Sequence, residues 1–305
     1  MLTRPAALAR AYFAVQAASA VAWWILVFTA EPVRTATLGR LDPVLVGAFD
    51  IPLFAVASLL AALGARWAVW VLWPWTLLVT AALAGYATVT GLAGWGVVAM
   101  VAASASTSAA ALLMLRGLIP TELLLSGPLR IREARAASLA RHSATTGVQI
   151  VAFWGLFLVI IPLIISALED RWGLTASVPS WIRIAGGALL AAASALGLWS
   201  AFAMSTRGEG TPLPSATARR LVLTGPYLFV RNPMAVAGIT QGVAVGLLLG
   251  SWLVVAYALA GSLVWNWGVR PQEEADLEAR FGAPYREYRS AVRCWIPRFR
   301  AYAHR

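Results

Sequence analysis

The sequence predicts an all-α integral membrane protein with about eight transmembrane segments, the last two forming a tight helical hairpin. Three observations support this fold class. Hydrophobic residues make up 60% of the chain and charged residues only 12%, whereas about a quarter of the residues in a soluble domain are charged. The mean hydropathy is +0.74. The apolar residues also gather in runs of the roughly 20 residues that a helix needs to cross a bilayer.

Six of these runs have the length of a single span. The run Ala235–Val269 is too long for one, because a helix of that length would extend about 50 Å, well beyond the roughly 30 Å hydrocarbon core. We expect it to form a hairpin that turns near Gly250-Ser251. The first run lacks a small-residue cleavage site, so we expect a span and not a signal peptide. The single spans are expected at Ala7–Ala30, Val44–Ala65, Ala68–Thr90, Gly94–Leu115, Gly147–Leu168 and Ile182–Met204.

The positive charge predicts the orientation in the membrane. All basic residues are arginines, and they gather in the loops Gly117–Thr146 and Ser205–Met234 and in the tail after Val269. By the positive-inside rule, both termini and these loops are expected on the cytoplasmic side. Topology and attraction to anionic lipid explain the net charge of +11 without a nucleic-acid partner. The abundance of Ala and Arg and the lack of Lys suggest a bacterial protein, which would place it in the inner membrane.

The chain is expected to divide into a four-span region (1–116), a cytoplasmic Arg-rich loop (117–146) and a second membrane region with a cytoplasmic tail (147–305). The single cysteine, Cys294, excludes an internal disulfide, and no Cys/His cluster predicts a metal site. The histidines His142 and His304 lie far in sequence from the polar motifs described next. Polar chemistry is therefore expected in the second membrane region, without histidine catalysis.

The stretch "TGPYLFVRNPMAVAG", Thr224–Gly238, interrupts the apolar pattern. Gly225-Pro226 and Asn232-Pro233 break helical structure, which leaves a short constrained segment before the next helix. Helix N-termini favour anions, and Arg231 adds a planar fork that suits carboxylate or phosphate. The stretch therefore indicates either a ligand site or a lipid-headgroup anchor with a prolyl turn.

Two adjacent carboxylates, Glu273 and Glu274, follow the hairpin on the same membrane side. Carboxylates are unfavourable beside an anionic leaflet, so they are expected to face an arginine or a ligand with an ammonium or diol group. The alternative is an acid pair in a first helical turn that complements the helix dipole. Apolar and aromatic residues then recur at helical spacing, and Gly282–Pro284 interrupts that amphipathic segment.

Together, "GPYLFVRNPMAVAG", the hairpin and "EEADLEARFGAPYREYRSAVRCWIP" resemble the isoprenylcysteine carboxyl methyltransferase and phospholipid methyltransferase superfamily. The family pattern has Gly-Pro-Tyr and Arg-His-Pro, two helices, then Glu-Glu-x-x-Leu and Phe-Gly-x-x-Tyr-x-x-Tyr. The resemblance covers about Gly147–Pro297, and the two paired motifs at this spacing are fairly specific. The first four spans resemble no family that we can name.

The resemblance implies a membrane methyltransferase with S-adenosylmethionine bound from the cytoplasmic side and a lipophilic or amphiphilic acceptor from the bilayer. The catalytic positions implied are Arg231 and Asn232. Arg231 would face the cofactor's carboxylate, and the glutamates its ammonium and ribose diol. The implied cofactor contacts are Pro226, Tyr227, Arg231, Asn232, Pro233, Met234, Glu273 and Glu274.

This sequence departs from the family pattern at several positions. Asn232 stands at the family histidine, Leu228 at the arginine after the tyrosine, and Ala235 at a tyrosine. A family glycine is Ala237 here, with Gly238 one position late. These departures argue against an isoprenylcysteine acceptor, and the acceptor atom (oxygen, nitrogen or sulfur) stays open.

Two other functions remain open from the sequence. Membrane sterol reductases share the helical arrangement and use NADPH, although the acid pair argues against binding a pyrophosphate. A transporter or scaffold is the other alternative, because Asp50 lies within a span, where an acid is costly. Its position near the span end, before Pro52, would allow local hydration. Asn266 is expected either to line an acceptor pocket or to form a helix–helix hydrogen bond.

Overall fold

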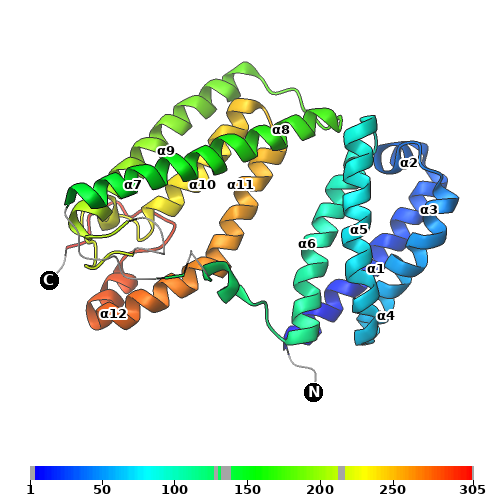
Figure 1. Ribbon diagram of the computed structural model, residues 1–305, viewed down its shortest axis with the longest axis horizontal. Helices are drawn as coiled ribbons and strands as arrows, with labels where there is room; N and C mark the ends of the chain where they lie inside the picture. The colour runs from blue at the N-terminus through cyan, green and yellow to red at the C-terminus, as the bar shows by residue number, and fades with distance from the viewer. Residues whose placement is uncertain (1–3, 127–129, 132–138, 212–216, 304–305) are drawn as a thin grey trace. The chain divides into compact units, whose positions relative to one another are not determined.

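The computed structural model describes residues 4–126, 130–131, 139–211 and 217–303. Within these ranges the chain is helical and contains no β-strand, which confirms the predicted fold class (Figure 1). Arg132 and Arg135 of the predicted Arg-rich loop lie outside the described residues, as does His304.

The described chain contains seven helices that are long and apolar enough to cross a membrane. The predicted hairpin is present, but its first helix, α10 (Pro233–Leu249), has only 17 residues. At ~1.5 Å per residue it is shorter than the roughly 30 Å hydrocarbon core. The count of eight spans therefore stays a prediction. The seven helices are Arg4–Thr29, Pro43–Leu63, Arg66–Thr90, Gly94–Arg116, Ala144–Arg171, Ser180–Arg207 and Trp252–Ala291.

The chain forms two compact units. The first comprises Met1–Pro120 and Leu168–Leu174, and the second Thr121–Ala167 and Thr175–Arg305. The assignment of functions to parts of the chain stays a prediction.

In the first unit, α1 packs against α4 and α6, and α5 packs against α4 and α6. Between the predicted spans Ala7–Ala30 and Val44–Ala65 lies a short helix, Glu31–Leu38, that was not predicted from the sequence. Pro52 lies in the first turn of a π-helical segment, because proline has no N–H to complete the α-helical ladder. The elements are α1 (Arg4–Thr29), α2 (Glu31–Leu38), α3 (Pro43–Asp50), η1 (Ile51–Val56), α4 (Ala57–Leu63), α5 (Arg66–Thr90) and α6 (Gly94–Arg116).

The Asp50 carboxylate is enclosed in the first unit, with an exposed fraction of 6%. The indole N–H groups of Trp24 and Trp75 donate to its two oxygens, each at 3.0 Å. Buried polar groups need such partners. Local hydration was the wrong expectation, because two tryptophans supply the hydrogen bonds.

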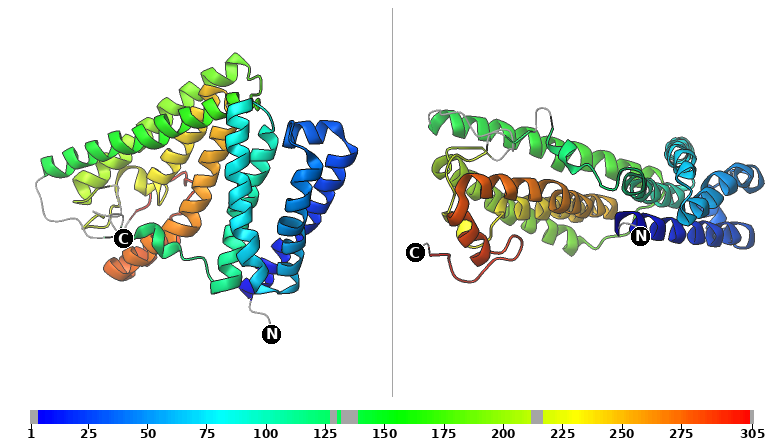
Figure 2. Two further views of the ribbon diagram at one scale, coloured as in Figure 1. Left: turned by 45° about the vertical axis from the view of Figure 1, so that its right-hand side comes forward. Right: turned by 90° about the horizontal axis from the view of Figure 1, so that it is seen from below.

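In the second unit, α9 (Ser180–Arg207) lies beside α10, as Figures 1 and 2 both show. Small residues permit this approach: a Cβ added at Gly186 would lie 2.9 Å from the Leu247 Cβ atom. The hairpin turns at Gly250, which has a φ of 72°, and the Ser251 side chain caps α11. The other elements are η2 (Thr121–Leu125), α7 (Leu139–Trp154), η4 (Gly155–Ile160), α8 (Ile161–Arg171, of which the residues from Leu168 on belong to the first unit), η6 (Gly225–Leu228), α11 (Trp252–Val264), η7 (Trp265–Val269) and α12 (Arg270–Ala291).

The helix Trp252–Ala291 has 40 residues, which at ~1.5 Å per residue is about twice the hydrocarbon thickness. Its first part, Trp252–Val269, has no charged residue, whereas α12 is rich in Arg, Glu and Asp. The membrane-spanning part therefore ends near Val269, and α12 lies outside it. Gly282 breaks α12 with a φ of 56°, a conformation that favours glycine, so the predicted interruption at Gly282–Pro284 is confirmed.

Candidate active site

The candidate site begins with the loop between α9 and α10. Gly225, with a φ of 58°, opens the 3-10 turn η6, and Pro226 and Tyr227 are buried within it. Asn232 then caps α10: its Oδ1 atom accepts from the Ala235 N–H at 3.1 Å. Pro233 occupies the first helical position, where its missing N–H has no cost. The two proline breaks thus hold the intervening segment in one conformation.

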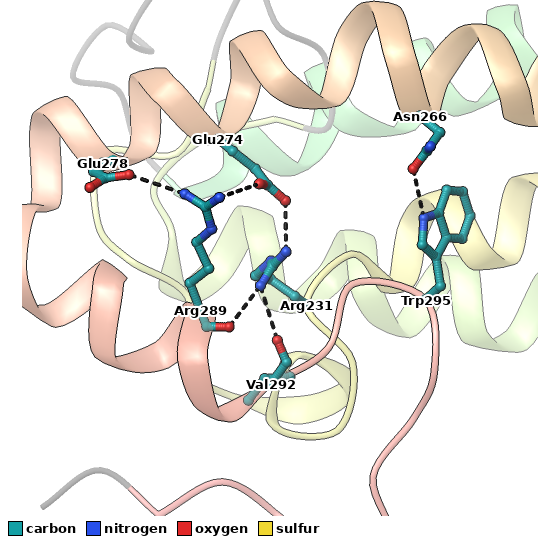
Figure 3. Close-up of polar contacts among 7 residues, drawn as sticks. All are labelled: Arg231, Asn266, Glu274, Glu278, Arg289, Val292 and Trp295. Atoms are coloured by element: carbon teal, nitrogen blue, oxygen red, sulfur yellow. Dashed lines mark hydrogen bonds and ion pairs between the residues drawn. The ribbon is translucent and has the colours of Figure 1, made fainter.

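Arg231 leaves this segment and contacts both ends of α12 (Figure 3). Its Nη2 atom lies 2.7 Å from the Glu274 Oε1 atom, and both side chains are largely buried, at 12% and 14% exposure. Its Nη1 atom donates to the carbonyl oxygens of Arg289 at 2.9 Å and Val292 at 3.1 Å. The planar fork thereby fixes the distance between the start and the end of α12.

A second arginine completes this network. Arg289 lies 3.7 Å from the Glu274 Oε2 atom and 3.1 Å from the Glu278 Oε2 atom. Glu274 therefore faces two guanidinium groups, and its charge is compensated within the protein.

The neighbouring Glu273 has a different environment. Among the described residues, its carboxylate has no hydrogen-bond or ion-pair partner. Burial, with smaller contributions from the charges of Glu274 and Asp276, raises the pKa of Glu273 to about 7. The two adjacent glutamates therefore differ: one is paired, and the other remains available to a ligand.

Further polar atoms near these residues also lack partners. The Oη atoms of Tyr227 and Tyr285 and the Nε atom of Arg231 are buried without a hydrogen bond within the described protein. Burial, together with the charges of Tyr288 and Glu273, raises the pKa of Tyr227, so its hydroxyl remains a donor. Burial also raises the pKa of Tyr285 to about 12. Unpaired buried polar atoms are costly, and together with Glu273 they are suited to a polar ligand.

The structure brings some of the predicted site residues together. Arg231 contacts Glu274 directly, and the negative charge of Glu273 contributes to raising the pKa of Tyr227. Within the described chain, Asn232 and Met234 make no hydrogen bond to either glutamate. The Asn232 amide nitrogen stays free to donate, because its oxygen serves as the helix cap.

The segment that closes this arrangement was not predicted from the sequence. The C-terminal strap, which we define as Val292–Tyr302, pairs with the loop before α10. The Arg231 N–H donates to the Arg293 carbonyl, and the N–H groups of Arg298 and Tyr302 donate to the carbonyls of Phe229 and Leu228 at 2.9 and 3.0 Å. The only sequence signal was the regular aromatic spacing before the strap, which predicts a packed face but no partner.

The strap also contacts the end of the membrane-spanning helix. The Trp295 Nε1 atom donates to the Asn266 Oδ1 atom at 2.9 Å, as Figure 3 shows. The Trp295 ring packs edge-on against Trp265 at 5.1 Å between ring centroids. The expectation of a helix–helix hydrogen bond for Asn266 was wrong, because its partner lies in the strap.

Residues 181–283 match the family model described as phospholipid methyltransferase. The C-terminal half of this chain is phospholipid methyltransferase-like. The match confirms the predicted resemblance, and it includes the loop before α10, the hairpin and both glutamates. It indicates a membrane methyltransferase. No curated protein and no solved structure matches the chain.

The phospholipid methyltransferase-like segment ends at residue 283, near the break in α12 at Gly282. The carbonyls that hold Arg231 and the whole strap follow this segment in the sequence. The candidate site therefore combines the matched segment with the end of α12 and the strap, which the family match does not include.

Proposed function

We propose that the protein is an integral membrane methyltransferase that uses S-adenosylmethionine and methylates a lipophilic or amphiphilic acceptor. The observation that carries this proposal is the Arg231–Glu274 contact. It joins the loop before α10 to the start of α12 within the segment that matches the methyltransferase family. The Nε atom of Arg231 and the hydroxyls of Tyr227 and Tyr285 are buried without a hydrogen-bond partner in the described protein.

The residues present fit this cofactor in their donor and acceptor chemistry. The Glu273 carboxylate is assigned to the ammonium or the ribose hydroxyls, since it has no partner among the described residues. The Tyr227 and Tyr285 hydroxyls and the Asn232 amide are unpaired donors, suited to a carboxylate or an adenine edge. Pro226, Pro233 and Met234 are proposed as apolar contacts.

The structure favours a change in the role of two residues. Arg231 and Glu274 were expected to bind different groups of the cofactor, but they pair with each other. We therefore assign them to positioning: Arg231 holds the loop against both ends of α12, and Glu274 compensates its charge.

The cofactor would supply a methyl group on a sulfonium. The acceptor atom would bond to the methyl carbon as the carbon–sulfur bond breaks, and the electron pair of the broken bond would stay on sulfur. Such a displacement needs two aligned reactants and little water. The protein's part is positioning by Arg231 and by the strap. A proton carried by the acceptor atom would leave to solvent.

The arginine distribution supports a site that faces the cytoplasm, in the inner membrane of a bacterium. A membrane lipid is the acceptor class that the family match favours. No observation favours a reductase or a transporter, and Asp50 is held by two indoles.

The proposal is tested by calorimetry on the full chain in detergent, with S-adenosylmethionine and NADPH as separate titrants. We expect binding of S-adenosylmethionine and none of NADPH. Binding of NADPH without binding of S-adenosylmethionine would contradict the proposal and would indicate a reductase.

The raised pKa of Glu273 predicts a pH dependence for cofactor binding. Below a pKa of about 7 the side chain is protonated and neutral, so its attraction to an ammonium is lost. S-adenosylmethionine affinity should therefore fall as the pH is lowered from about 8 to about 6. Calorimetry should show this fall in the parent and in the Glu287→Gln variant, whose substitution is exposed on the same helix. Glu273→Gln should give weak, pH-independent binding, and an unchanged profile would remove Glu273 from the site.

A further inference from the structure

The C-terminal strap carries two large apolar side chains that nothing in the described protein covers. Phe299 is fully exposed, and Ile296 is 59% exposed. Other apolar and aromatic residues of the strap behave differently, since Val292 and Tyr302 are buried in one cluster with Tyr288 of α12. The strap is therefore well packed on one side, while its other side presents apolar surface that is unfavourable in water.

One set of contacts places this apolar surface beside the membrane. Trp295 donates to Asn266, which lies in η7, just before the membrane-spanning part ends near Val269. On the same short segment Trp267 is 68% exposed, and tryptophan is typical of the boundary between membrane and water. Ile296 follows Trp295 directly, so it lies at the level of this boundary.

A second set of contacts fixes the other end of the strap at the same side of the hairpin. The N–H groups of Arg298 and Tyr302 donate to the carbonyl oxygens of Phe229 and Leu228 at 2.9 and 3.0 Å. These carbonyls lie just before α10, the first helix of the hairpin, begins. Phe299 lies between the two anchored N–H groups and is therefore held close to the membrane surface as well.

The strap also carries positive charge that the protein does not compensate. In the described part of the chain, no carboxylate lies within ion-pair distance of its arginines. In contrast, Arg286 and Arg289 on α12 have acidic partners. Exposed apolar residues flanked by unpaired basic ones are suited to the interface of an anionic lipid leaflet. The arginines of the strap are Arg293, Arg298 and Arg300.

We propose that the strap docks on the anionic leaflet of the membrane that the protein spans, with Ile296 and Phe299 inserted at the interface. The partner is the leaflet surface, and the methyl acceptor takes no part in this contact. The strap is bonded to the candidate site, because the Arg293 carbonyl accepts from the Arg231 N–H at 2.9 Å. Docking therefore stabilises the closed strap and makes the order of the loop before α10 depend on membrane surface charge. The consequence for cofactor binding rests on the proposed function, whereas the docking does not.

Hydrogen exchange of the full chain, without cofactor, tests the docking through the N–H groups of Arg298 and Tyr302, which are hydrogen-bonded only while the strap is closed. The protein is placed, one copy per disc, in nanodiscs of phosphatidylcholine alone or with phosphatidylglycerol. We expect strap exchange to be roughly tenfold slower in the anionic discs, because each arginine near an anionic surface contributes favourably. Equal exchange in the two lipid compositions would overturn the proposal.

Variants at exposed positions separate docking from a folding defect. Phe299→Ser removes the apolar contact and Arg300→Gln removes one unpaired charge, and both positions are exposed. Each variant should fold like the parent and show a smaller difference between the two lipid compositions. Arg286→Gln, whose charge is paired with Glu278 on α12, should keep the difference of the parent. A difference like that of the parent in both strap variants would contradict the docking.

Contact with lipid is measured by a fluorophore on Phe299→Cys in a Cys294→Ala background, since Cys294 is the single cysteine. Lipids with a spin label near the headgroup should quench it several times more than a fluorophore on Arg286→Cys, and quenching no greater than at Arg286 would overturn the proposal. Slow strap exchange that appears only in discs with two copies would replace the bilayer with a second copy as the partner. These measurements need no S-adenosylmethionine, so failure here and failure of the proposed function are distinguishable.

Discussion

Arg231→Lys is expected to lose most methyl transfer while the protein still inserts and folds. Lysine keeps one charge but cannot contact Glu274 and the carbonyls of Arg289 and Val292 at once. Each lost hydrogen bond to a charged group is worth about 1.5–3 kcal/mol, so loss of positioning should lower activity roughly ten- to a hundredfold. The measurement is labelled methyl incorporation into a bacterial lipid extract.

The matched control is Arg220→Lys in the same loop. The Arg220 side chain is 72% exposed and contacts Glu209 at 3.0 Å, a surface pair of small energetic value. This variant should have nearly the same methyl-transfer activity as the parent. S-adenosylmethionine affinity should also fall in Arg231→Lys, because the loop that carries Tyr227 is no longer held against α12. Activity equal to that of the parent would mean that Arg231 serves only as a positive charge that orients the protein in the membrane.

The sequence predicted the apolar part of the fold well, because membrane-spanning helices depend on local composition. The hairpin turn at Gly250 and the break at Gly282 were predictable for the same reason, since glycine and proline act on their own backbone. The predicted span Gly147–Leu168 lies within a longer helical stretch: α7 begins at Leu139, and the stretch apolar enough to cross a membrane extends from Ala144 to Arg171. Polar residues before the apolar run continue the helix there.

The partners of the polar residues could not be predicted in the same way. Arg231 and Glu274 were both singled out, but they are separated by 43 residues, and only the folded hairpin brings them together. Asp50 likewise gave no signal for its two tryptophans, which lie 26 and 25 residues away. The strap was missed because backbone hydrogen bonds carry no side-chain signature in the sequence.

The adjacent glutamates should respond in opposite directions to the same substitution. Glu274→Gln removes the charge that compensates the largely buried Arg231. Breaking a buried ion pair from one side costs on the order of 3 kcal/mol. We therefore expect a clearly lower Tm in detergent and reduced activity. Arg289 should not rescue the loss, because it carries the same charge as Arg231.

Glu273→Gln should instead raise the Tm at pH values above 7. The pKa of Glu273 is raised in the folded protein to about 7, so between its ordinary value and about 7 the folded state holds more protons than the unfolded state. Stability then falls as the pH rises through this window, and the penalty is fully present above it. A neutral glutamine removes that penalty, and it also removes the carboxylate proposed to hold the cofactor. A higher Tm with weaker S-adenosylmethionine binding is expected of a residue that serves ligand binding at a cost in stability. A lower Tm in both Glu273→Gln and Glu274→Gln would instead mean that the two glutamates only stabilise α12.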